Sequence, residues 1–326
     1  ADPIAVCGQL GGKASADETG AAGDDDMRTH WRTMPLFSAL FVSIGPFAME
    51  RVQPMSARLD ELLELLDLEQ VEKYLFRAYH PRDRQHRIYG GQIMAQALQA
   101  AANTVDSERP PHSLHGYFLR PGDPKVPALI DVEPIRDGRS FSTRRVVVIH
   151  HGQPIFNIAV SFQVIESGLP HSTPMPERQA PTDDMVPREM LKGAFLGWRH
   201  DHKRLLSDEA QPPYQDLWFK ANGAVPDDPV LHAALAVFES DNALLGTARM
   251  PHRDKMNRAK LQMASLDHAM WFHASPLTQW RADEWLLYSL DAPSASAARG
   301  YNRGMIYTAS GTLVASTMQE GLMRQH

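Results

Sequence analysis

The sequence predicts an α+β protein made of two copies of one unit, each a long buried helix wrapped by an antiparallel sheet. Three observations favour this class. Residues 91–102 are small or apolar nearly all round, which is typical of a helix that is buried on every side. Strand-like runs rich in Val, Ile, Phe and Tyr follow that helix. The order of long strand, turn glycine and long strand then recurs in the second half.

Composition limits the class of protein. The chain has 326 residues, of which 43% are hydrophobic and 22% are charged, with a net charge of −6. This suits a soluble globular protein with room for about two domains, and it gives no electrostatic reason to expect nucleic acid as a partner. The single cysteine, Cys7, excludes an internal disulfide framework and a cysteine-based zinc cluster. No apolar run reaches the roughly 18 residues that span a bilayer, so no membrane partner is expected.

Residues 1–54 are predicted to lie outside the folded domains. Residues 1–26 are rich in Gly, Ala and Asp, a composition that cannot build a hydrophobic core. Residues 27–48 have the layout of a short secretory signal, a basic stretch followed by an apolar one. We favour a disordered or appended extension, because nothing downstream looks exported. Export through residues 27–48 stays open as the alternative.

The first predicted domain covers residues 55–166. Leucines recur at helical spacing from Ser56, and Gly90-Gly91 opens the buried helix. Four strand-like runs follow, separated by turn signals: residues 112–119, 128–135, 140–151 and 154–165.

A linker and a second domain complete the chain. Residues 167–212 are predicted to be the linker, because prolines and charged residues alternate there, with one short helix around Arg188–Trp198. The second domain, residues 213–326, again has a helix, at 229–245, among strand-like runs.

The two halves align without gaps over one segment, residues 140–152 with residues 299–311. Arg144 falls on Arg303 and Gly152 falls on Gly311, both at an offset of 159 residues. Tyr117-Phe118 matches Trp271-Phe272 at an offset of 154. A repeat of about half the chain predicts two tandem copies of one fold.

The segment Ser265–His273 has an unusual composition. It places a hydroxyl, a carboxylate and two imidazoles in an apolar, aromatic run, and such groups are costly to bury without partners or a function. Structural interpretations stay open from the residues alone. Ser265 could be the N-cap of a following helix, Asp241 a solvated cap, and Gln319 a partner for a buried backbone group.

Segments in both halves resemble the acyl-CoA thioesterase II family, a family of double-hotdog hydrolases. The resemblance runs from about Leu59 to Arg324 and does not include residues 1–54. The matching segments include Tyr89-Gly90-Gly91-Gln92, Tyr117 to Asp123, Ser240-Asp241, Ser265 to His273 and Ser316 to Gly321.

The resemblance implies the fold and a catalytic site. The fold would be two tandem hotdogs, each a long helix wrapped by an antiparallel sheet, and the reaction the hydrolysis of acyl-CoA to a fatty acid and coenzyme A. The implied catalytic residues are Asp241, Ser265 and Gln319, with Asp267 and His268 in support. Asp241 would activate a water, without a covalent intermediate, while Ser265 and Gln319 hold that water.

The resemblance also bears on the number of sites and on partners. Under the repeat, Gln319 falls on Val160, which carries no polar group, so one site per pair of hotdogs is expected. Coenzyme A is part of the substrate, so neither a separate cofactor nor a metal is expected. Hotdog sheets usually pair edge to edge, which implies a homodimer or a higher homo-oligomer. The expected compartment is the bacterial cytoplasm.

Other functions stay open. A hotdog enoyl-CoA hydratase would use an Asp and a His on one segment, as Asp267 and His273 suggest, and a non-catalytic protein would bind acyl-CoA without turnover. A serine hydrolase would show a G-x-S-x-G elbow, which the sequence lacks. The sequence also lacks the G-x-G-x-x-G, P-loop and H-E-x-x-H patterns, so nucleotide redox chemistry, NTP chemistry and a zinc protease site are not expected.

Overall fold

The structure is a computed structural model that describes residues 56–81, 87–182, 184–257 and 260–326. The predictions for residues 1–54 therefore lie outside the described residues. Within the described ranges, no helix is both long enough and apolar enough to cross a membrane.

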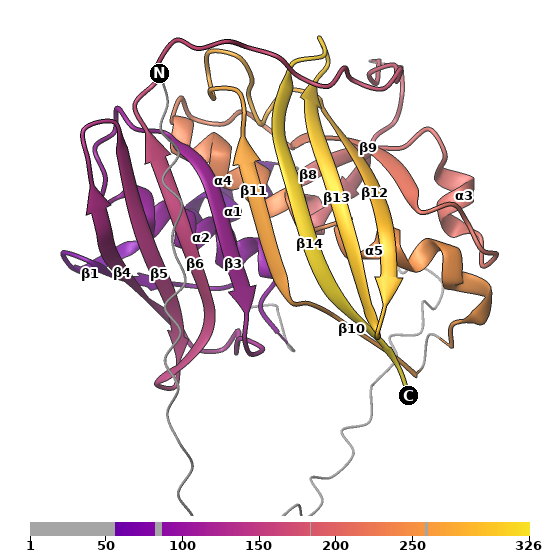
Figure 1. The fold of residues 1–326 in the computed structure, drawn as a ribbon, viewed down its shortest axis with the longest axis horizontal. Coiled ribbons are helices and arrows are strands. Elements are labelled where there is room, and N and C mark those ends of the chain that lie inside the picture. Colours follow the sequence, from indigo (N-terminus) through magenta and orange to yellow (C-terminus); the bar gives the residue numbers. More distant parts are fainter. Residues whose placement is uncertain (1–55, 82–86, 183, 258–259) are drawn as a thin grey trace, which may run out of the picture. The chain divides into compact units, whose positions relative to one another are not determined.

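One antiparallel sheet dominates the fold (Figure 1). Among the described residues it has fourteen strands, thirteen of them in the order β1-β2-β4-β5-β6-β3-β11-β14-β13-β12-β9-β8-β7, while β10 pairs with β14. The strands of the first half are β1 (Glu69–Glu72), β2 (Leu75–Ala78), β3 (Pro111–Phe118), β4 (Ala128–Asp137), β5 (Phe141–His150) and β6 (Gln153–Gln163). Those of the second half are β7 (Arg188–Met190), β8 (Phe195–Trp198), β9 (Tyr214–Ala221), β10 (Leu261–Ser265), β11 (Asp267–Phe272), β12 (Leu286–Ser296), β13 (Arg299–Thr308) and β14 (Leu313–Gln325).

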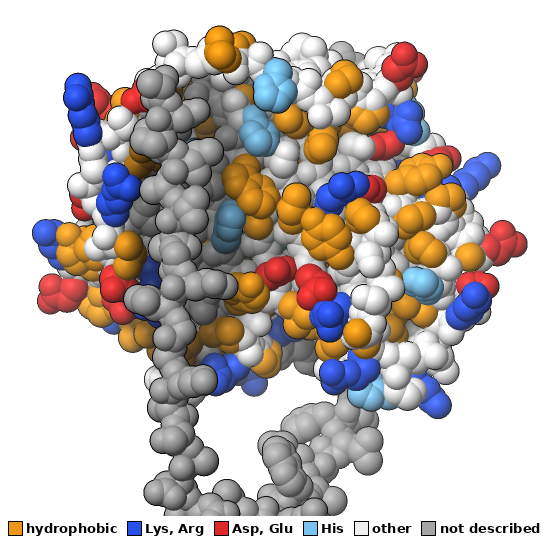
Figure 2. All heavy atoms as spheres, viewed as in Figure 1, with side chains coloured by type: hydrophobic (Ala, Val, Ile, Leu, Met, Phe, Trp, Pro, Cys, Tyr) orange, Lys and Arg blue, Asp and Glu red, His pale blue; other side chains and the backbone are white. Residues whose placement is uncertain are grey.

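Two buried helices lie against one face of this sheet, behind it in Figure 1. They are α2 (Gly90–Ala102) and α4 (Pro229–Ser240), and they pack on each other. The other helices are α1 (Ser56–Leu66), α3 (His202–Leu206), α5 (Leu244–Arg249) and the 3-10 helices η1 (Leu191–Gly193) and η2 (Met250–Lys255). Figure 2 shows the opposite face of the sheet. The burial pattern of β3, β13 and β14 alternates, and Tyr117, Met305 and Met318 are at exposed positions of these strands. The predicted α+β class is confirmed.

Counted outward from the central pair β3 and β11, the strand order is the same in both halves, because the two halves repeat one topology. Strands β2, β4, β5, β6 and β3 of the first half correspond to β9, β12, β13, β14 and β11 of the second. The halves join where β3 pairs with β11, and there Tyr117 lies opposite Asp267 while Ser113 lies opposite Trp271. An offset of 154 residues relates Ser113 to Asp267 and Tyr117 to Trp271, so it converts one of these pairs into the other. A local twofold axis therefore passes between His115 and Ala269, which are related by the same offset and lie opposite each other.

The structure corrects the gapless alignment of the repeat by one residue. Arg144 points inward and is 2% exposed, whereas Arg303 points outward and pairs with Asp291 at 2.5 Å. The true counterpart of Arg303 is Arg145, which makes the equivalent cross-strand ion pair with Glu133 at 3.1 Å. The error arose because the β13–β14 turn is one residue longer than the β5–β6 turn. A shift of one residue reverses which face a side chain occupies.

The segment around Arg188–Trp198 is mostly strand, with only a three-residue 3-10 helix at its centre. It forms β7, η1 and β8, which extend the sheet beyond β9, so the second half of the predicted linker contains strands and the helix α3. The alternating burial of β8 has a period of two residues, which suits a strand rather than a helix. Gly197 also lies so close to Met190 that an added Cβ would be 2.2 Å from its sulfur.

Two further expectations change. Ser265 is not followed by a helix, because β10 ends at Ser265 and β11 begins at Asp267. The helix expected at 229–245 ends at Ser240, where Asp241 is the C-cap. The Tyr288 hydroxyl donates to the carbonyl of Ser240 at 3.0 Å, which satisfies one of the carbonyls left free at the helix end.

Candidate active site

The site lies where the C-terminus of α4 meets the N-terminus of α2. Asp241 caps α4, and the Gly91 backbone N–H, in the first turn of α2, donates to its Oδ2 at 3.1 Å. A Cβ on Gly90 would lie 2.7 Å from the same oxygen, and one on Gly91 would lie 2.2 Å from the carbonyl oxygen of Phe238. Glycine at both positions therefore lets the two helices approach closely enough to form this contact.

The structure brings the three predicted catalytic residues together. The Ser265 hydroxyl, at the end of β10, donates to Asp241 Oδ1 at 3.2 Å. The Gln319 amide, on β14, donates to the same oxygen at 2.6 Å. The carboxylate thus has hydrogen bonds from a backbone N–H, a hydroxyl and an amide, and it lies at the positive end of the α2 helix dipole.

His268 extends this cluster into the core. Its side chain points inward from β11 and is 1% exposed. The Nδ1 atom lies 3.2 Å from Gln319 Nε2, and Nε2 lies 3.0 Å from the Ser240 hydroxyl. Burial lowers the pKa of His268 well below its ordinary value, although the charge of Asp241 acts in the opposite direction. The imidazole is therefore neutral at physiological pH.

Asp267 lies beside the cluster rather than in it. Its carboxylate accepts a hydrogen bond from the Glu320 backbone N–H at 2.6 Å. Glu320 lies on β14 at the point where the strand paired with β14 changes from β11 to β10. Burial raises the pKa of Asp267, although the hydrogen bond from the Glu320 N–H lowers it. His273 bonds the Ser316 hydroxyl at 2.9 Å, so Asp267 and His273, the pair that a hydratase would use, have separate partners.

Sequence reasoning missed four groups around the site. The Gly91 N–H has no sequence signal beyond the glycine pair, and Ser240 was noted only as the neighbour of Asp241. Tyr288 is fully buried, and its hydroxyl links Ser240 to Thr317. Glu239, one residue before Ser240, is also fully buried. Burial raises the pKa of Glu239 to about 8, although the bond from Asn242 and the charge of Arg199 lower it.

The position related to this site by the local twofold axis lacks its chemistry. The equivalent C-cap on α2 is an asparagine, and the two equivalent strand positions carry a proline and a valine. These residues, none of which has an acidic or basic side chain, are Asn103, Pro111 and Val160.

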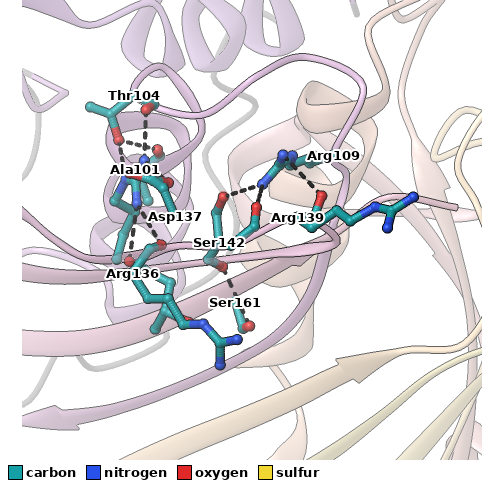
Figure 3. A network of polar contacts seen from close by, with 11 residues as sticks. Ala101, Thr104, Arg109, Arg136, Asp137, Arg139, Ser142 and Ser161 are labelled. Atoms are coloured by element: carbon teal, nitrogen blue, oxygen red, sulfur yellow. Dashed lines mark hydrogen bonds and ion pairs between the residues drawn. The ribbon is translucent and has the colours of Figure 1, made fainter.

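A buried arginine lies beside that second position, opposite Val160 on the neighbouring strand. Arg144 donates to the hydroxyl of Thr104 at 2.9 Å, to its carbonyl at 3.0 Å and to Asp137 Oδ1 at 2.8 Å. Figure 3 shows Thr104, Arg136 and Asp137 of this network. Neither position holds a metal cluster: among the described residues, no group of three or more His, Cys, Asp or Glu side chains is placed to bind one.

Comparisons with known proteins agree with this architecture. A family model described as acyl-CoA thioesterase matches residues 199–322, and one described as the acyl-CoA thioesterase N-terminal domain matches residues 79–163. Mouse acyl-coenzyme A thioesterase 8 is 38% identical over 290 residues, which cover 80% of this chain and 88% of the relative. Acyl-CoA thioesterase 2 of Haemophilus influenzae is 34% identical, with coverage of 83% and 99%.

Solved structures give the same result. The acyl-CoA thioesterase II TesB2 of Mycobacterium marinum has a TM-score of 0.70 and 40% identity, with coverage of 82% of this chain and 98% of that one. A hot dog fold protein from Alicyclobacillus acidocaldarius is only 18% identical, with coverage of 82% and 98%, but its TM-score of 0.68 shows a shared fold. The chain therefore belongs to the acyl-CoA thioesterase II family and has the tandem hotdog fold.

Proposed function

We propose that the protein hydrolyses the thioester bond of acyl-coenzyme A by means of a water activated by Asp241. The observation that carries the proposal is the Asp241 carboxylate, which is held at the N-terminus of α2 by Gly91, Ser265 and Gln319. The names of the relatives at 34–38% identity support the choice of acyl-CoA as the substrate.

The reaction needs one base and one site for negative charge. Asp241 takes a proton from water, and the water oxygen bonds to the thioester carbon while Ser265 and Gln319 keep the water in place. The carbonyl oxygen becomes an oxyanion, which a backbone N–H at the start of α2 stabilises. When the C–S bond breaks, the proton on Asp241 passes to the sulfur and the free acid leaves.

The site needs no further group for these steps. Coenzyme A enters as part of the substrate, and we expect turnover without added metal or organic cofactor. The homo-oligomeric assembly and the cytoplasmic compartment stay predictions of the sequence. The separate partners of Asp267 and His273 give no support to a hydratase.

Thiol release from saturated acyl-CoA tests the proposal. Wild-type protein should release coenzyme A in the presence of a chelator, and Asp241→Asn should lower kcat by roughly 100-fold or more, because the amide cannot take the proton. An Asp241→Asn variant with near wild-type turnover would disprove the assignment of the base. Tight binding of acyl-CoA by the wild type without any thiol release would instead favour the non-catalytic alternative.

A further inference from the structure

We propose that His268 is a positioning residue, which fixes the Gln319 side-chain amide so that Oε1 is the atom that accepts a hydrogen bond from the attacking water. The inference rests on the proposed function, because it assigns a role within the same site. A series of hydrogen bonds leads from the Val237 carbonyl through His268 to the Asp241 carboxylate, and the inference follows from which groups in this series can donate.

The first link is the Ser240 hydroxyl. Its oxygen lies 2.9 Å from the carbonyl oxygen of Val237 and 3.0 Å from His268 Nε2. The Asp241 backbone N–H donates to the carbonyl of Glu239 rather than to that of Val237. A carbonyl oxygen can only accept, and a hydroxyl has one hydrogen to donate. Ser240 therefore donates to Val237 and accepts from His268.

The second link is the imidazole. Because Ser240 accepts, the hydrogen of the neutral ring is on Nε2, and Nδ1 is left as an acceptor. The atom of Gln319 that faces Nδ1 at 3.2 Å must then be the amide nitrogen. His268 thereby determines which end of the Gln319 amide points into the core.

The third link is the amide itself. One hydrogen of Gln319 Nε2 goes to His268 Nδ1, and the other goes to Asp241 Oδ1 at 2.6 Å. The Oε1 atom is buried and has no hydrogen-bond partner among the described residues. A buried acceptor without a partner is costly, and a water that donates to it would remove that cost.

His268 and Asp241 both accept from the Gln319 amide nitrogen, so both direct Oε1 at the water before the attack. The two acceptors differ after the attack, because a protonated carboxyl can donate as well as accept. The amide could then turn round, and its nitrogen rather than Oε1 would face the next water. His268 opposes this rotation throughout the cycle, because its Nδ1 can only accept.

A double-mutant cycle on kcat tests the inference. We expect His268→Phe to lower kcat by about 10- to 100-fold with KM nearly unchanged, and to lower it by less than about 3-fold in a Gln319→Ala background. His268→Asn, whose Oδ1 can take the place of Nδ1, should recover part of the loss. Unchanged kcat in His268→Phe, or an equal loss in both backgrounds, would overturn the inference.

His232 supplies the matched control. It is equally buried, on α4, and its Nδ1 accepts from the Ala282 backbone N–H at 2.9 Å, a contact separate from the site. His232→Phe should lower stability in the same way but leave the kcat of the folded protein unchanged.

Histidine ¹⁵N spectra of the wild-type protein give a test that needs neither a variant nor turnover. The resonances of His268 should show a protonated Nε2 and an unprotonated Nδ1, and the opposite tautomer would overturn the inference. Wild-type and Asp241→Asn kinetics in the same assay separate the two proposals. If the wild type releases no thiol, the proposed function fails, whereas if only His268→Phe departs from expectation, the positioning role fails.

Discussion

At the residue scale, the Asp241 carboxylate is held in place by a few fixed contacts. Its three donors come from α2, β10 and β14, so neighbouring elements hold it from three directions. A preorganised carboxylate of this kind can orient a water without a large rearrangement. Glu239, only two residues away, is fully buried and makes a hydrogen bond with Asn242.

Glu239 should make stability depend on pH. Burial raises its pKa from 4.5 to about 8, so between these two values the folded state holds a proton that the unfolded chain has released. The free energy of unfolding should therefore fall as pH rises from about 4.5 to 8. Glu239→Gln should remove this decline, as urea unfolding at several pH values would measure. Parallel pH profiles for the two proteins would contradict the prediction.

At the element scale, the site depends on the contact between two helix ends. The first turn of α2 reaches the last turn of α4 because Gly91 has no side chain to meet the Phe238 carbonyl. The same contact places the α2 N-terminus at Asp241, so packing and chemistry depend on a single position.

Gly91→Ala should therefore impair both stability and turnover. The new methyl would have to push α4 away, which costs about 1–3 kcal/mol and separates the Gly91 N–H from Asp241. We expect a lower urea midpoint and a lower kcat. Gly246→Ala in α5 is the control, since a Cβ there meets nothing within 4 Å. Equal behaviour of the two variants would contradict the argument.

Some of these elements could be predicted from the sequence and others could not. The buried helices and long strands follow from continuous patterns, and the family motifs led to Asp241, Ser265 and Gln319. The β7–β8 hairpin was missed because its strands are too short for a clear period. The hydrogen bond from the Gly91 N–H to Asp241 was missed because a backbone N–H has no signature in the sequence. The link from His268 to Ser240 is a contact between distant segments, which only the folded chain brings together.

At the scale of the whole described unit, the two positions related by the local twofold axis hold different residues. One holds the Asp241 cluster, and the buried Arg144 lies beside the other. The guanidinium of Arg144 bonds three backbone carbonyls and two side chains, all of them in the first half, so its contribution is to stability.

Arg144→Ala should separate stability from catalysis. It removes a buried guanidinium and leaves Thr104 and Asp137 without this partner, and we expect a loss of about 2–4 kcal/mol in the free energy of unfolding. The kcat of the folded variant should match that of the wild type. A large loss of kcat at unchanged stability would mean that the second position takes part in turnover.

The pairing of β3 with β11 joins the halves as two separate subunits would join edge to edge. In an assembly of identical chains, every substitution appears on both sides of the axis. Here the halves are encoded separately, so each can change without altering the other. One half carries the glycine pair at the start of α2, whose Gly91 N–H bonds the carboxylate, and the other half carries Asp241 itself. Covalent linkage thus permits a division of labour that a symmetric dimer of identical chains cannot have.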